Sequence, residues 1–253
     1  MKRFIALFSI VFTLLFICSV SAEETKVKFS IGEWEPYTGE KIENFGMTTE
    51  IVTAACKAVG LQAEYDFSPW KRAENNVLKG SHFGTFPYKE IQERTANYLF
   101  SNTLFSSSFG ILKYKKNTKT SSFTFASVED FKTYNVGIVA GTAAIKNPLN
   151  KAGVTVEDVP TGDQNLKKLE AGRIDFYIDD KAVIFQALKR NYSAEQIAQF
   201  EFLKSDFGEK NDFKIMISKK YPESQAILEK INDGLAKITE SGELQTILTK
   251  YGL

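Results

Sequence analysis

Arg94 is the residue of this chain whose type and surroundings most clearly suggest chemistry. It stands just past a short apolar run and ahead of a Phe100-Ser101 pair. A guanidinium offers two parallel donors to a carboxylate and cannot lose its charge. In a cleft, Arg94 would therefore suit the carboxylate of a small solute. The alternative is an exposed ion pair with Glu90 or Glu93, which would contribute under ~1 kcal/mol.

Several aromatic and acidic residues stand in loops that follow predicted strands. Glu33, Trp34 and Tyr37 come after the first strand, and Trp70 comes after the second. Ligands of open α/β sheets bind beyond the carboxyl ends of strands, so these loops are candidate binding elements. Two facing indoles would suit an apolar, aromatic or cationic group. Either tryptophan could instead cover the surface or the core of its lobe.

Five more residues, at three places in the chain, are candidates for binding polar groups. Gly141 and Thr142 begin a predicted helix, whose free N–H groups and dipole attract a carboxylate, and Thr142 adds a hydroxyl. Asp179 and Asp180 follow a predicted strand, and one of the two is expected to cap the next helix. Arg72 either reaches a cleft or lies on the outer face of its helix.

The elements that must position these residues alternate between strand-like and helix-like patterns, which indicates an α/β fold. A polar stretch over 115–122 separates two such series. Predicted strands cover 26–31, 62–67, 82–86, 109–114, 135–139, 154–159, 174–178 and 213–217. Predicted helices cover 47–59, 69–80, 162–171, 181–190 and 224–248, the last broken near 241–242.

Local signals mark several helix starts and faces. Ser68 and Pro69 predict a cap and a first-turn proline for the helix that follows them. Ser127 and Asp130 form a start that resembles a capping box. The helix after Pro69 is predicted to bury Ala73, Val77 and Leu78.

The first 22 residues have the pattern of an export signal. Lys2 and Arg3 precede an apolar run over 4–17, and small residues at 20–22 favour cleavage after Ala22. The run is too short to span a membrane. Cys18 allows a lipoprotein alternative, which its bulky preceding residues disfavour. We therefore predict a periplasmic protein without a membrane span.

Composition excludes several functional classes. Removing Lys2 and Arg3 from the 32 basic side chains leaves 30 against 31 acidic ones, a net charge of −1. The lysines are interleaved with acids, which is not the pattern of a nucleic-acid-binding protein. Cys56 is then the only cysteine, so no intramolecular disulfide is expected, and the thiol is predicted to be buried. A single histidine, His82, argues against a metal site.

In their order and spacing, these segments resemble the periplasmic solute-binding proteins of the amino-acid type (family 3, type II periplasmic binding fold), which serve ABC importers. The family line runs from a strand through T-x-E-R to F-S-x-P-Y-Y a short distance later, and this chain has FPYKEIQERTANYLFSNTLF. SVEDFKTYNVGIVAGTAA, LEAGRIDFYIDD and ILEKINDGLAKITESGELQTILTKYG also resemble the family pattern. The resemblance implies two βα-sandwich lobes with a ligand cleft between them. Lobe 1 would comprise 23–112 plus 209–253, and lobe 2 would comprise 113–208.

The resemblance also implies roles for individual residues. Arg94 would hold the carboxylate of the ligand, and Trp34 and Trp70 would be aromatic walls of the site. An acid at Asp180, or its neighbour Asp179, would accept hydrogen bonds from an ammonium group. Together with the turn at 141–142, these residues would recognise a zwitterion from both lobes.

The chain departs from the family pattern just before the arginine. Relatives often carry threonine or serine donors there, whereas this chain has Pro87, Tyr88 and Lys89. Tyr88 could supply a hydroxyl in their place. The departure leaves another small polar molecule as an alternative to an amino acid.

These observations predict a monomeric receptor that closes two lobes around a small polar solute, most plainly an amino acid. The receptor would deliver the solute to an inner-membrane ABC permease, and this step requires no cofactor. One alternative is a periplasmic sensor without a transporter. Another is an exported enzyme resembling cyclohexadienyl dehydratases, with Glu33 or Asp180 as the acid, although no nucleophile–base arrangement is readable.

Overall fold

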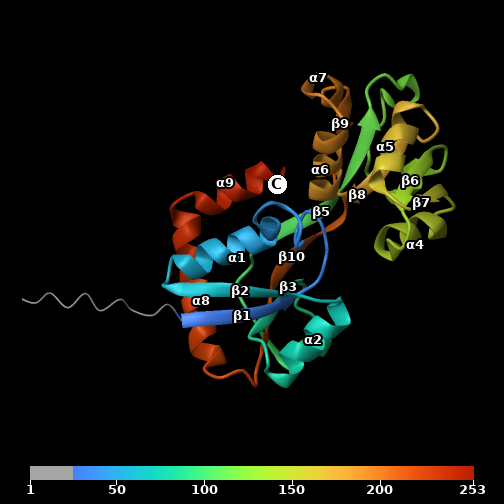
Figure 1. Cartoon of the computed structure of the whole chain (residues 1–253). Coiled ribbons are helices and arrows are strands. Elements are labelled where there is room, and N and C mark those ends of the chain that lie inside the picture. Colours follow the sequence, from blue (N-terminus) through green and yellow to red (C-terminus); the bar gives the residue numbers. More distant parts are fainter. Residues whose placement is uncertain (1–24) are drawn as a thin grey trace, which may run out of the picture.

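The computed structural model describes residues 25–253, so the predicted export signal and Cys18 lie outside the described part. Two lobes are joined by two long antiparallel strands, β5 (Phe105–Tyr114) and β10 (Phe207–Ser218), that run from one lobe into the other (Figure 1). Every helix between residues 25 and 253 is too short or too polar to form a membrane span.

The first lobe contains both ends of the described chain. β1 pairs in parallel with β2 and β3, and β3 pairs antiparallel with β10. The C-terminal helices return to this lobe and pack beside α1 (Figure 1). Its strands are β1 (Thr25–Ile31), β2 (Leu61–Phe67), β3 (Gly84–Tyr88) and β4 (Tyr98–Phe100). Its helices are η1 (Glu43–Phe45), α1 (Met47–Lys57), α2 (Trp70–Lys79), α3 (Gln92–Thr95), α8 (Ser224–Glu240) and α9 (Glu243–Lys250).

The second lobe is a parallel three-stranded unit attached to β5. β6 pairs in parallel with β7 and β8, and β8 pairs antiparallel with β5. Its further strands are β6 (Asn135–Val139), β7 (Thr155–Val159), β8 (Phe176–Asp180) and β9 (Phe200–Phe202). Its helices are η2 (Thr118–Thr120), η3 (Val128–Phe131), α4 (Ala143–Lys151), α5 (Gly162–Glu170), α6 (Lys181–Asn191) and α7 (Ala194–Ile197).

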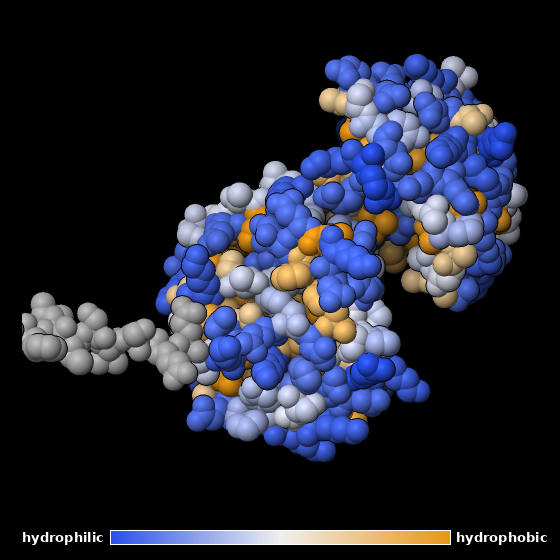
Figure 2. Space-filling view, in the orientation of Figure 1, coloured by the Kyte–Doolittle hydropathy of each residue, from blue (hydrophilic) through white to orange (hydrophobic). Residues whose placement is uncertain are grey.

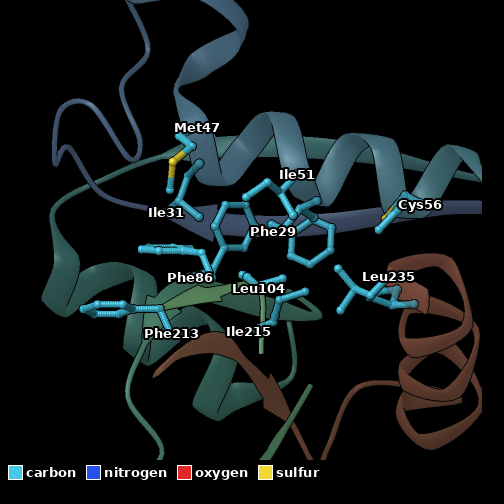
Figure 3. Packing of buried hydrophobic residues seen from close by; sticks show 14 of the residues in the cluster. Phe29, Ile31, Met47, Ile51, Cys56, Phe86, Leu104, Phe213, Ile215 and Leu235 are labelled. Carbon is cyan, nitrogen blue, oxygen red and sulfur yellow. The ribbon is translucent and has the colours of Figure 1, made fainter. Parts of the chain in front are cut away.

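Each lobe has its own apolar core. In the first lobe, side chains of α1, β1, β3, β10 and α8 point toward one another, as Phe29, Phe86 and Ile215 do in Figure 3. Two further clusters fill the second lobe, one around Phe176 and one around Tyr177. Because β5 and β10 run through both lobes without a break, the residue limits of the lobes stay a prediction.

Cys56 is buried in the core of the first lobe, as the sequence predicts. Figure 3 shows it on α1, on the side of the core where Leu235 of α8 lies. Burial raises the pKa of its thiol to about 12, so the side chain behaves as a small apolar group. His82 is partly buried and lies 3.4 Å from the carboxylate of Asp66.

Most predicted elements are present, but two strands begin later than the sequence pattern indicates. The strand predicted at 82–86 is Gly84–Tyr88, and the one predicted at 174–178 is Phe176–Asp180. In both cases pairing with neighbouring strands sets the limits. β10 pairs with Gly84–Tyr88, β6 pairs in parallel with Phe176, and β5 pairs antiparallel with Tyr177–Asp180. As a result, Asp179 and Asp180 are the last two residues of β8 and do not belong to a following loop.

Two local predictions at α2 are wrong. Ser68 does not cap the helix, since Pro69 is the N-cap residue and the Ser68 hydroxyl lies 3.2 Å from that of Ser30. Leu78 is exposed, because α2 rests on the sheet along a narrow stripe that includes Ala73 and Val77. By contrast, the capping box at Ser127 is confirmed, as is the break that separates α8 from α9.

Candidate ligand-binding site

A pocket of about 520 Å³ lies where the two lobes meet. The molecule narrows at this junction, and a hollow opens between the lobes on one side (Figure 2). The pocket is lined from the first lobe, from the second lobe and from the two connecting strands. The lining residues are Trp34, Glu35, Lys89, Ser107, Ser108, Phe109, Val139, Thr142, Pro160, Thr161, Gly162, Asp179, Asp180, Val183, Asn211 and Phe213.

Strand direction explains why these residues converge. β1 and β3 are parallel, so the loops after Ile31 and Tyr88 leave the same edge of the first sheet. β6, β7 and β8 are also mutually parallel, so the residues after Val139, Val159 and Asp180 leave one edge of the second sheet. The two edges face the junction, which is where open α/β sheets bind ligands.

Asp180 is the most extensively bonded group in the pocket. The hydroxyl of Tyr37 donates to its Oδ1, and the hydroxyl of Ser107 donates to its Oδ2 at 2.5 Å. Oδ1 also accepts from the backbone N–H groups of Ala182 at 2.9 Å and Val183 at 3.5 Å, so Asp180 caps α6. Burial raises the pKa of this carboxyl above its ordinary value although these donors oppose the shift.

Tyr37 connects the lobes through this carboxylate. Its ring is fully buried in the core of the first lobe, stacked on Phe105 at 5.0 Å between ring centroids, while its hydroxyl reaches Asp180 on the second. Burial and the nearby Asp180 charge hold the pKa of the Tyr37 hydroxyl well above its ordinary value. Tyr37 therefore forms part of the junction beneath the pocket and does not line it.

Asp179 points to the opposite face of β8. Its Oδ2 accepts from the Tyr177 hydroxyl at 2.7 Å, and its Oδ1 accepts from the backbone N–H of Asp180 at 2.8 Å. Burial raises the pKa of the Asp179 carboxyl to about 6. Both acids line the pocket, but Asp179 accepts two hydrogen bonds and Asp180 accepts four. Since a carboxylate has about four acceptor positions, Asp179 retains more capacity for a donor on a ligand.

Trp34 is one of three aromatic side chains that line the pocket, with Phe109 and Phe213. It is partly buried and packs against Tyr37 and Phe213, with ring centroids 4.7 and 5.6 Å away. Across the junction, Thr142 lines the pocket at the start of α4. Its hydroxyl donates to the carbonyl of Val139 at 2.7 Å. This bond fixes the turn, and the hydroxyl oxygen keeps acceptor capacity.

Arg94, Tyr88 and Trp70 form a separate cluster on the first lobe, and none of the three lines the pocket. The Arg94 guanidinium carbon lies 4.7 Å from the centre of the Tyr88 ring, and its Nη1 donates to the backbone carbonyl of Lys89 at 3.0 Å. Tyr88 is buried, and its ring contacts that of Trp70 at 5.7 Å between centroids. Within residues 25–253, Arg94 forms no ion pair with Glu90 or Glu93, and Glu90 instead pairs with Lys214.

Trp70 is held in place by the loop that carries Trp34. Its Nε1 donates to the backbone carbonyl of Glu33 at 3.2 Å. A Cβ at Gly32 would lie 2.4 Å from its ring, so the absent side chain at that position makes room for the indole. Trp34 thus belongs to this loop and Trp70 packs against it, but of the two only Trp34 lines the pocket.

The remaining predicted site residues lie outside the pocket lining. Glu33 is exposed, and its carboxylate accepts from the backbone N–H of Glu40 at 3.2 Å. Gly141 is an exposed turn residue whose φ of 92° favours glycine. Arg72 is exposed on α2. The binding roles given to these residues from the sequence stay predictions.

Several lining residues have no counterpart among the sequence-based candidates. Ser107, Ser108 and Asn211 belong to stretches of β5 and β10 that the apolar pattern does not reveal, because these strands become polar where they cross between lobes. Lys89 immediately follows β3. Its position directly after a predicted strand could have made Lys89 a candidate from sequence. In the sequence analysis it appears only as a departure from the family pattern.

A second hollow of about 610 Å³ adjoins the pocket and shares Glu35, Thr161, Gly162 and Val183 with it. It extends along α6 toward Lys250 and Tyr251 of the first lobe. The two buried acids of β8 line only the first pocket, which therefore combines more groups able to bind a polar solute. Within residues 25–253, no group of three or more His, Cys, Asp or Glu residues could hold a metal ion.

Comparison with known proteins identifies one family. The model of the "bacterial extracellular solute-binding proteins, family 3" matches residues 30–253. A comparison with curated protein sequences gave no significant match.

Solved structures show the same fold at low sequence identity. The L-cystine solute receptor of Neisseria gonorrhoeae, in the unliganded open conformation, is 16% identical, with a TM-score of 0.72 over 90% of this chain and 93% of that one. Substrate-binding domain 2 of GlnP from Lactococcus lactis, also open, is 19% identical, with a TM-score of 0.71 over 90% and 96%. AbpA, an amino acid ABC transporter substrate-binding protein of Streptococcus pneumoniae bound to L-arginine, is 17% identical, with a TM-score of 0.59 over 89% and 94%.

Proposed function

The chain belongs to the bacterial extracellular solute-binding proteins of family 3, and from this premise we propose that it captures a small zwitterionic solute, an amino acid, between its two lobes. The proposal further makes it a periplasmic receptor that delivers this solute to an inner-membrane ABC permease. The matching family model describes solute-binding proteins, and the compared structures are described as a substrate-binding domain and a substrate-binding protein.

The observation that carries the proposal is the pocket at the lobe junction. Loops that follow parallel strands of both lobes line it, so a bound solute would touch both lobes at once. A ligand that contacts both lobes stabilises the closed arrangement over the open one. The higher TM-scores against the two open structures than against the arginine-bound one support assigning the present arrangement to the open form.

The groups in the pocket suit an amino acid. Asp179 keeps acceptor capacity for an ammonium group. Thr142, on the other side of the pocket from Trp34, has a hydroxyl oxygen that can accept a further hydrogen bond from the solute. Trp34 and Phe213 provide an apolar surface for a side chain. Recognition of a zwitterion also needs a partner for the carboxylate.

Thermal melting of residues 23–253 with a panel of amino acids, polyamines and small organic acids tests this function. A solute at ~100 times its Kd should add ~2.7 kcal/mol to the free energy of unfolding. Trp34→Ala should abolish the shift, whereas Phe45→Ala, an exposed aromatic outside the pocket, should keep it. If no amino acid shifts the melting of the wild-type chain, the proposed solute class is wrong.

Transport and sensing need a separate measurement, since both use the same lobe closure. We expect cells that lack this chain to lose uptake of the radiolabelled solute that shifts its melting temperature. Unchanged uptake would instead favour the sensor alternative.

A further inference from the structure

Glu35 is an acid at the opening between the pocket and the second hollow. Its side chain is exposed, and it lines both spaces together with Thr161, Gly162 and Val183 of the other lobe. Within residues 25–253 its carboxylate makes no ion pair and no hydrogen bond. A solute side chain too long for the pocket would therefore pass Glu35 on its way into the second hollow.

Every other acid that lines the two spaces in the described part of the chain has a partner. In the second hollow, Glu43 lies 3.0 Å from the ammonium group of Lys250. Asp163 lies 2.7 Å from the guanidinium of Arg190. The two aspartates at the end of β8 accept hydrogen bonds from tyrosine, serine and backbone donors. Among these described acids, only Glu35 has its full acceptor capacity left for a solute.

The pocket at the lobe junction has an excess of negative charge. Its described lining contains three acids, Glu35, Asp179 and Asp180, and one base, Lys89, which gives a formal charge of −2. The second hollow is balanced, with three acids and three bases among its described lining residues. A cleft lined by one sign of charge attracts solutes of the opposite sign. An amino acid with an uncharged side chain has no net charge, whereas one with a cationic side chain complements this excess.

Backbone hydrogen bonds fix the position of Glu35 at this opening. The N–H of Tyr37 donates to the carbonyl of Trp34 at 2.8 Å, which closes a turn around Glu35. The N–H of Trp34 donates to the carbonyl of Thr38 at 2.8 Å, and the Thr38 hydroxyl donates to the carbonyl of Gly32 at 2.7 Å. The turn is anchored because the Tyr37 ring is fully buried in the first lobe. Little ordering of the loop is then needed when a solute binds.

The surface beside Glu35 suits the stem of a long cationic side chain. Trp34, Phe109 and Phe213 line the pocket with it. The methylene groups of a lysine-like or arginine-like side chain pack on such apolar surface while the charged end stays in a polar environment. Aromatic faces also attract a cation. The pocket therefore offers apolar contact to the stem and a carboxylate to the end of the same side chain.

We propose that the solute is a basic amino acid and that Glu35 binds the cation at the end of its side chain. This inference rests on the proposed function, because it names the class of amino acid that the pocket takes. Exposed ion pairs contribute little. Closure of the lobes moves Thr161 and Val183 toward Glu35 and removes water from the new pair, which strengthens the attraction between the two charges. Glu35 thus acts as a specificity residue that works in the closed form.

Calorimetric titration with paired solutes tests this assignment. The probes are L-arginine with L-citrulline and L-lysine with L-norleucine. Within each pair the α-ammonium and α-carboxylate groups are the same, so the ratio of affinities reports the charge of the side chain. In the wild type, the charged member of at least one pair should bind about 10-fold more tightly or better, because it gains a charged hydrogen bond. In Glu35→Gln this ratio should fall to about threefold or less.

Glu40→Gln is the matched control. It removes the same charge from the same loop, at an exposed position outside the lining of both spaces. It should keep the wild-type ratio within about twofold. Because Glu35 is also exposed, Glu35→Gln should melt within about 2 °C of the wild type without solute, which separates a binding effect from misfolding.

Failure of the inference and failure of the proposed function give different results. If uncharged amino acids bind the wild type and the basic ones do not, the inference is overturned while the proposed function stands. The same holds if basic amino acids are preferred but Glu35→Gln keeps the ratio, or if Glu40→Gln lowers it equally. If no amino acid binds the wild type, the proposed function fails and the inference fails with it.

Discussion

The Asp180 junction and the Arg94 cluster are two regions in which a charged side chain is tied to neighbours, but with opposite consequences. Asp180 is buried, accepts four hydrogen bonds and still lines the pocket. Arg94 is only partly buried, makes one hydrogen bond and an aromatic contact, and lies outside the pocket lining. A residue type in the expected motif position therefore does not establish which groups remain free for a ligand.

The difference lies in what each region does for the fold. At the junction, Tyr37 of one lobe, Ser107 of a connecting strand and the start of α6 all depend on one carboxylate. The Arg94 cluster lies on one lobe and connects only neighbouring segments. Loss of a group from the junction should affect folding, whereas loss of a group from the cluster should have small effects.

The largest effect is expected for Asp180→Ala. The substitution removes the cap of α6 and leaves the buried hydroxyls of Tyr37 and Ser107 without their acceptor. We expect a loss of about 3 kcal/mol in the free energy of unfolding, measured by urea denaturation. Asp158→Ala, which removes the exposed partner of Lys146, should cost under about 1 kcal/mol. Equal losses in the two variants would show that the junction is not specially dependent on Asp180.

An effect of pH is expected from Asp179, whose carboxyl has a pKa raised by burial to about 6. Between about pH 4 and pH 6 the folded chain keeps a proton that the unfolded chain has released, so stability falls as the pH rises through this window. For Asp179 the fall should reach up to about 3 kcal/mol. Asp179→Asn should remove this fall, so the free energy of unfolding of the variant should increase relative to that of the wild type from pH 4 to pH 6.

Tyr177→Phe gives the matched variant for this titration. The Tyr177 hydroxyl donates to Asp179 and lowers the pKa of that carboxyl, so its removal should extend the window toward higher pH. Parallel pH profiles for the wild type and Asp179→Asn would contradict the assignment of the titration to Asp179.

The smallest effect is expected in the Arg94 cluster. Trp70→Phe removes the exposed hydrogen bond to the Glu33 carbonyl but keeps an aromatic ring against Tyr88, and it should cost about 1 kcal/mol or less. Since Trp34 is then the remaining tryptophan, its fluorescence should still change when a solute binds. In Trp34→Phe the response should be weaker, because Trp70 lies outside the pocket lining. A full response from Trp70 would show that both indoles face one cavity.

Much of the fold follows from local sequence signals. Alternating strand and helix patterns predict the α/β fold, and the position of Cys56 on an apolar helix face predicts its burial. The capping box at Ser127 and the helix break before Gly242 are likewise local, because the groups involved lie within a few residues of each other. The two-lobed fold could be predicted because the order and spacing of whole segments resemble those of a known family.

The site was only partly accessible from sequence. Four candidates line the pocket: Trp34, Thr142, Asp179 and Asp180. Thr142 is a candidate because it begins a predicted helix, the two acids because of the family resemblance, and Trp34 because of the rule that ligands bind beyond the carboxyl ends of strands. The same rule does not reveal Ser107 or Asn211, which lie inside strands that cross between the lobes.

Local periodicity and capping along the chain are thus enough to predict the elements, their class and the candidate loops. The partners of the charged side chains depend on contacts between distant segments. Asp180 is held by a tyrosine 143 residues away on the other lobe, whereas Arg94 is held by a ring and a carbonyl of its own segment. The Asp180 contact depends on how strand ends from two lobes meet, and no local pattern along the chain encodes that meeting.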